Sequence, residues 1–144
     1  GILQKVLTIS TDEKLTEEEV GKVVGAPKSV LVNAFLEALA SKNIEAAVEN
    51  FHKAIAAGSE PKVFTLLAVA KSRAVLLLRF APKLGAGLEG EYGPDDFAFL
   101  QKLAKEGTAL NAGVLAELLT ALIEMNRAPL PQISLELALY RALS

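Results

Sequence analysis

Regularly spaced signals for the starts and ends of helices constrain the fold of this chain more than any other feature. Apolar residues recur every three or four positions in successive segments, and proline or asparagine opens several of these segments while glycine closes others. Proline suits the first turn of a helix and glycine the position just past its end, so the pattern predicts α-helices joined mostly by short loops. No segment shows the apolar and polar alternation of a strand. The sequence therefore predicts an all-α helical bundle of about seven helices.

These signals also place the individual helices along the chain. The first expected helix is followed by a short one that opens with a capping box of Thr16 and Glu19. Asn43 is expected to cap a later helix that Gly58 ends, and the glycine-rich stretch LGAGLEGEYG is expected to be a flexible connector. The expected ranges are 1–10, 16–25, 27–41, 44–57, 61–80, 94–107, 110–126 and 133–143.

Composition excludes several classes of protein. The 144 residues fit one domain, or one domain with a fragment of another, and 51% of them are hydrophobic, which excludes global disorder. The net charge of -2 provides no basic field for direct nucleic-acid binding. No cysteine is present, and no apolar run reaches the ~18 residues of a membrane-spanning helix. Because the chain starts at Gly1 inside an apolar-periodic run, we interpret it as a piece of a longer protein.

The last eleven residues, SLELALYRALS, raise the question of what buries their apolar side chains. A helix with this sequence is apolar on nearly every side, so it must be covered on more than one side. The helix before it, 110–126, also has apolar residues on more sides than a single packing contact would bury. We therefore expect a subunit interface on these two helices. The candidate interface residues are Leu118, Leu122, Leu135, Leu139, Tyr140 and Leu143.

Three charged residues stand in otherwise apolar helical segments: Arg73, Arg79 and Glu136. A buried charge is costly unless it is paired, although a long arginine side chain can also extend its charged end to solvent. The hypothesis that follows from burial is an ion pair of Glu136 with Arg73 or Arg79. Such a pair would fix the last helix against the long helix 61–80.

No constellation of residues indicates catalysis. The single histidine, His52, has no converging metal ligands by spacing, and we interpret it as a solvated surface residue. The acidic pairs and clusters at 17–19 and 95–96 fit the starts of helices, where carboxylates interact favourably with the helix dipole. The glycine-rich stretch lacks the strand, loop and Lys-Ser/Thr of a phosphate-binding loop. We therefore expect no catalytic residue, no cofactor and no metal.

Three stretches together resemble one family. LQKVLTISTDEKLTEEEVGKVVGAP resembles the end of the lid domain in clamp-loader ATPases. FLEALASKNIEAAVENFHKAIAAGSEPKVFTLLAVAKSRAVLLL is similar to the all-helical domain that follows, with Arg73 at the arginine position of its long helix. ISLELALYRAL resembles the closing helix, with Glu136 at the acidic position. The order and spacing of these stretches resemble domain III of the DNA polymerase III gamma/tau subunit.

The resemblance implies a collar domain in a bacterial clamp loader. It places the tail of a lid domain at 1–26 and the helical collar at 27–144. It implies a cytoplasmic replication protein that assembles with itself, delta and delta prime, while ATP hydrolysis and DNA contact belong to residues before Gly1. Three alternatives stay open: the related domain of the delta subunit, a helical-repeat adaptor that binds peptides, and a small helical enzyme. AVENFHKAIAAGSEP is similar to a tetratricopeptide helix, but the ~34-residue period of such repeats is missing.

Overall fold

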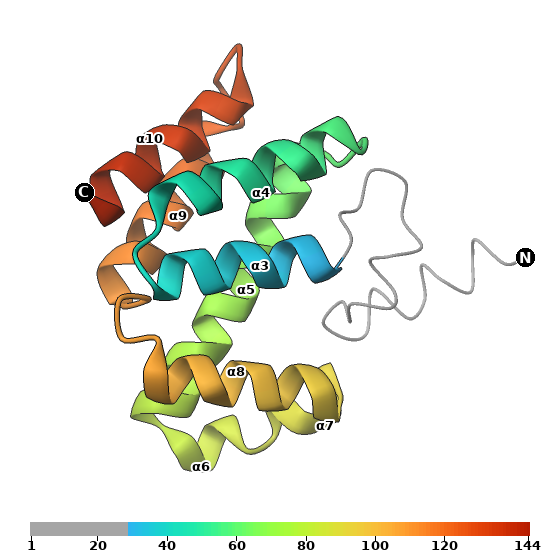
Figure 1. Ribbon diagram of the computed structural model, residues 1–144, viewed down its shortest axis with the longest axis vertical. Coiled ribbons are helices and arrows are strands. Elements are labelled where there is room, and N and C mark those ends of the chain that lie inside the picture. The colour runs from blue at the N-terminus through green and yellow to red at the C-terminus, as the bar shows by residue number, and fades with distance from the viewer. Residues whose placement is uncertain (1–28) are drawn as a thin grey trace, which may run out of the picture.

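The computed structural model describes residues 29–144, and within that range it is an all-α bundle without a strand (Figure 1). The expected fold class is therefore confirmed. The helices, labelled as in Figure 1, are α3 (Ser29–Ala40), α4 (Ile44–Ala56), α5 (Pro61–Phe80), α6 (Pro82–Gly85), α7 (Leu88–Tyr92), α8 (Pro94–Glu106), α9 (Ala112–Glu124) and α10 (Pro131–Leu143). The helix expected over 1–10, the capping box of Thr16 and Glu19 and the lid segment 1–26 lie outside the described residues.

The helix boundaries agree with the start and end signals in the sequence. The Asn43 side chain accepts a hydrogen bond of 3.0 Å from the backbone N–H of Ala46, and Asn111 accepts the equivalent bond from Val114. Each bond satisfies a backbone donor that has no partner within its helix. Proline occupies the first turn of α5, α6, α8 and α10. Gly58, just past α4, has a φ of 100°, a conformation that glycine adopts without steric cost.

Helix α5 runs through the middle of the molecule and contacts the helices on both sides of it (Figure 1). Three phenylalanines join α3, α4 and α5 at one end of the core. The Phe64 ring lies 5.0 Å from that of Phe35 and 5.3 Å from that of Phe51, between ring centroids. All three side chains are fully buried. The first half of α5 is therefore covered by its own chain on this side, whereas its last residue, Phe80, is exposed.

The last helix, α10, is covered by its own chain on its apolar side. It packs mainly against α9, with further contacts to α4 and α5. One face of the helix, which includes Leu135, Ala138, Leu139 and Leu143, is buried in this way. The strongly apolar sequence of α10 thus has an explanation within the described bundle, and only its outer face requires another one.

The prediction that the glycine-rich stretch is a flexible connector is wrong, because this part of the chain forms two short helices. Helices α6 and α7 cover most of it, and Leu88 at the start of α7 is buried in the core. A Cβ atom on Gly85 would lie 2.7 Å from the Leu78 side chain, so glycine lets this turn approach α5 closely. Burial of one leucine and this close approach outweigh the low helix propensity of glycine.

Gly107 ends α8 as expected, but the reason for a glycine there is contact and not backbone conformation. Its φ of -92° is accessible to any residue. A Cβ atom at this position would lie 2.5 Å from the Cβ of Ala40, at the end of α3. The end of α8 can therefore meet the end of α3 only because residue 107 has no side chain.

Replacing Ser72 by alanine is expected to stabilise the protein. Ser72 is fully buried in α5, and among the described residues its hydroxyl has no hydrogen-bond partner, which costs free energy in the folded state. We expect Ser72→Ala to raise the free energy of unfolding by about 1 kcal/mol in urea denaturation. Thr65→Val is the control, because the Thr65 hydroxyl donates to the Pro61 carbonyl oxygen at 2.8 Å and its loss should not stabilise. A destabilised Ser72→Ala variant would contradict this reading.

Candidate functional site

Glu136 pairs with a histidine on a neighbouring helix. One of its carboxylate oxygens lies 2.6 Å from Nε2 of His52, so the pair joins α10 to α4. The expected pair of Glu136 with Arg73 or Arg79 is therefore not the arrangement that forms. The reason is the direction of α10, which turns Glu136 toward α4, whereas Arg79 stands in the last turn of α5 at the opposite end of the molecule (Figure 1). His52 is exposed, as predicted, although it has this partner.

Arg79 binds backbone carbonyl groups where α8 ends. Its Nε donates to the carbonyl oxygen of Ala104 at 2.9 Å, and its Nη1 donates to that of Leu110 at 2.7 Å. Its Nη2 donates to the carbonyl oxygens of Leu103 and Gly107, both at 3.2 Å. The last carbonyls of a helix have no partners within the helix, and a cation there is also favoured by the helix dipole. Arg79 therefore fastens the end of α8 and the following turn to α5.

A buried polar cluster joins α3, α5 and α8. The Lys71 side chain is only 2% exposed, and its ammonium group donates to Oδ1 of Asn33 at 2.7 Å and lies 3.4 Å from Oδ2 of Asp96. Asn33 in turn donates to Oδ1 of Asp96 at 3.2 Å. Sequence reasoning missed this cluster and assigned Asp96 only to the helix dipole. Asp96 does stand in the first turn of α8, and it is also the counter-charge of a buried lysine.

The stability of the fold should depend on pH in the alkaline range. Burial lowers the pKa of Lys71 below 10.5, against the opposing effect of Asp96. The unfolded chain then holds a proton that the folded chain has released, so stability rises as the pH approaches 10.5. Burial, with Glu91, raises the pKa of Tyr92 from 10.0 to about 12. There the folded chain keeps the proton, so stability falls between pH 10 and 12.

Tyr92→Phe separates these two effects. The variant should lose the part of the decline above pH 10 that the tyrosine causes, while the rise below that pH stays. Urea denaturation followed by circular dichroism at several pH values between 8 and 11.5 measures both. An unchanged decline in Tyr92→Phe would contradict the assignment to this phenol group.

The residues expected at a subunit interface divide into two groups. Leu118, Leu135, Leu139 and Leu143 are buried in the core of their own chain, so they are unavailable to a partner. Leu122 is partly buried, and Tyr140 is exposed. The helical period was right, but the apolar residues on all sides of α10 gave no indication of which face turns inward. The large apolar residues that are exposed on α9, on α10 and between them are Leu119, Ile123, Leu130, Ile133, Leu137 and Tyr140.

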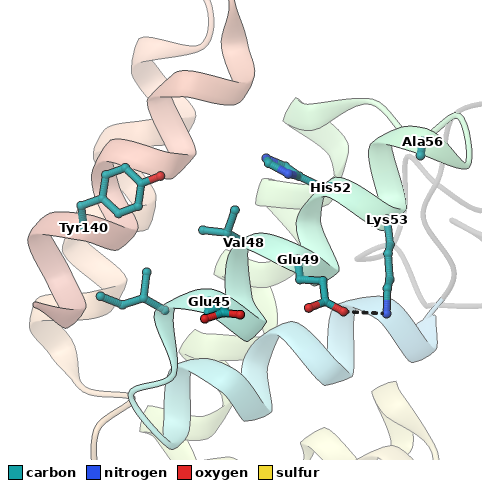
Figure 2. A pocket seen from close by; sticks show the side chains of 8 residues that line it. Glu45, Val48, Glu49, His52, Lys53, Ala56 and Tyr140 are labelled. Atoms are coloured by element: carbon teal, nitrogen blue, oxygen red, sulfur yellow. Dashed lines mark ion pairs between the residues drawn. The ribbon is translucent and has the colours of Figure 1, made fainter.

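A groove with mostly apolar walls runs between α4 and α10. Its larger hollow has a volume of about 720 Å³ and is lined on the α4 side by Ile44, Val48 and Ala56, with Tyr140 opposite. Figure 2 shows Tyr140 on α10 across from the side chains of α4, with Glu45 and Glu49 along the rim. A second hollow of about 400 Å³ continues the groove toward the start of α10 and shares His52 and Ala56 with the first. The described residues contain no group of three or more His, Cys, Asp or Glu that could hold a metal ion.

Comparison with known families decides what the bundle is. The sequence matches the family of DNA polymerase III subunits gamma and tau, domain III, over residues 15–144. The chain belongs to this family. No match is found among curated proteins or among solved structures.

Membership of the gamma/tau domain III family makes this chain a domain of a DNA polymerase III clamp loader. The matched range includes every described helix, from α3 to α10, so the whole bundle is the family domain. The resemblance inferred from the three sequence stretches is thereby confirmed, and the delta subunit gives way to gamma/tau. Within this gamma/tau domain, none of the described helices is long and apolar enough to cross a membrane.

Proposed function

We propose that this gamma/tau domain III is the oligomerisation and scaffold domain of its clamp loader. In this role it holds ATPase modules side by side through contacts with further copies, with delta and with delta prime, and performs no chemistry itself. It would work in the bacterial cytoplasm, where it supports the loading of sliding clamps during DNA replication.

The observation that carries this proposal is the distribution of exposed apolar side chains. Ten large apolar residues within the described range 29–144 are exposed, and six of them lie on α9, on α10 or in the loop between. The core of the same bundle is closed, with 25 buried hydrophobic residues, so these side chains are not left over from a poorly packed fold. Clustered apolar side chains on the surface of a well-packed domain mark sites of association.

The solution mass of the 144-residue chain tests the proposal. Light scattering across a concentration series should show a mass that rises above that of one chain and levels off at a small number of copies, such as three or four. The same measurement with delta and delta prime added tests assembly with those subunits. A stable monomer at every concentration, alone and in these mixtures, would overturn the scaffold role.

A further inference from the structure

Two surfaces with exposed apolar side chains lie at opposite ends of the molecule. The first is the groove between α4 and α10 described above. The second consists of Phe80 at the end of α5 and of Lys83 and Leu84 in α6, and we call it the knob. Figure 1 shows α4 and α10 at the top of the molecule and α6 at the bottom. One copy can therefore present its knob to one neighbour and its groove to another.

The knob is exposed, and its Phe80 ring lies beside an arginine that is itself fixed by hydrogen bonds. Phe80 and Leu84 are each 73% exposed, more than any other large apolar residue of the described chain. The guanidinium carbon of Arg79 lies 5.9 Å from the centre of the Phe80 ring, and that guanidinium is fixed by its bonds to four carbonyl oxygens. An apolar anchor that is already ordered before contact loses little conformational freedom on binding.

The groove is also formed before any partner binds. The pair of His52 with Glu136 ties its two helical walls together between the larger and the smaller hollow. The larger hollow is open and has apolar side chains on both walls, so it can receive a bulky apolar side chain. Phe80 and Leu84 are side chains of this kind.

The charges on the two surfaces are complementary. The segment 80–88 contains one base, Lys83, and no acid. The rim of the groove carries the acids Glu45 and Glu49, and Glu49 is already paired with Lys53 at 3.1 Å. Among the described residues, Glu45 has no ion-pair partner. An entering lysine would therefore meet an uncompensated carboxylate at this rim.

We propose that the knob of one copy enters the groove of a second copy of this chain, head to tail. The proposal rests on the oligomerisation role and names the two surfaces that carry it. In this arrangement Phe80 and Leu84 pack between Val48 and Tyr140, and Lys83 faces Glu45. The two terminal copies of such an assembly keep one free surface each, a knob at one end and a groove at the other. Contacts between unlike surfaces build closed rings when these ends meet and open arcs when they do not.

Mixing two variants tests this arrangement. Leu84→Glu disables the knob and leaves the groove intact, whereas Tyr140→Glu disables the groove and leaves the knob intact. Both positions are exposed, so the bundle should fold in each variant. Light scattering should find each variant monomeric at concentrations where the unchanged chain assembles. A mixture should give a one-to-one dimer and nothing larger, because only one working knob and one working groove meet. Leu66→Glu is the matched control, since Leu66 is as exposed as Tyr140, at 46%, and belongs to neither surface; it should assemble like the unchanged chain.

The outcomes separate this inference from the proposed function. If the unchanged chain assembles and both variants assemble equally well, the two surfaces are wrong while the scaffold role stands. If one variant is monomeric and the other assembles like the unchanged chain, the contact joins like surfaces. If each variant is monomeric but the mixture gives no dimer, the knob and the groove do not bind each other. Either result overturns the head-to-tail arrangement. If the unchanged chain is monomeric at every concentration, alone and with delta and delta prime, both fail.

A charge exchange tests the predicted contact of Lys83 with Glu45. Lys83→Glu alone should weaken assembly by up to about fivefold, as expected for one exposed ion pair. Adding Glu45→Lys in the same chain should restore the original strength, because the pair re-forms between copies with its charges exchanged. If the double variant is as weak as Lys83→Glu or weaker, this contact is wrong.

Discussion

Replacing Arg79 by methionine is expected to destabilise the folded chain by about 3 kcal/mol. Methionine has a similar length but removes the bonds to all four carbonyl oxygens. The carbonyls of Leu103 and Gly107 keep a backbone N–H partner, whereas those of Ala104 and Leu110 lose the guanidinium that bonds them. These groups are partly buried, so water replaces the lost bonds incompletely. Urea denaturation at neutral pH, followed by circular dichroism, measures the loss.

The chain offers a matched control on the same helix. Arg73 is exposed on α5, and Arg73→Met should change the free energy of unfolding by less than about 0.5 kcal/mol. Arg79→Lys should recover only part of the loss, because an ammonium group cannot reproduce the planar fork of donors. Equal losses in Arg73→Met and Arg79→Met would show that the carbonyl contacts contribute nothing to stability.

Replacing Asp96 by alanine is expected to cost a similar amount, about 3 kcal/mol, for a different reason. The change removes the counter-charge of an ammonium group that is almost fully buried and also takes an acceptor from Asn33. A buried charge without its partner is among the most destabilising changes in a protein interior. Thermal and urea denaturation at neutral pH both measure this loss.

The neighbouring residue provides the control for Asp96. Asp95 stands in the same first turn of α8 but is exposed, so Asp95→Ala should lose only the interaction with the helix dipole, up to about 1 kcal/mol. Adding Lys71→Met to Asp96→Ala should recover stability, since the ammonium group that needed a partner is gone. A double variant less stable than Asp96→Ala would contradict the coupling of the two charges.

Most of the helices could be predicted because their signals are local. Asn43, Pro61 and Pro94 mark helix starts by their own chemistry, and each marks a start in the structure. The prediction for the stretch 84–93 was wrong because its helices depend on contacts with α5 and the core. These contacts outweigh the low helix propensity of its glycines. Contacts of this kind leave no periodic signal in the sequence.

The candidate site was harder to predict, since its partners are distant in sequence or belong to the backbone. His52 and Glu136 are 84 residues apart, so their spacing carries no information. The acceptors of Arg79 are carbonyl groups, which every residue has. Lys71 was missed because a lysine in a helix is normally solvated, and only the assembled bundle shows that it is enclosed.

Helix α5 also has a mechanical consequence for an assembly of such domains. Its twenty residues span about 30 Å, and its only proline is at its first position, with no glycine that could act as a hinge. It begins near the groove end of the molecule and ends at Phe80 in the knob (Figure 1). If copies join through the knob and the groove as proposed, α5 connects the two contacts and contains no internal proline or glycine at which it could bend. A collar built in this way would then be stiff between one contact and the next.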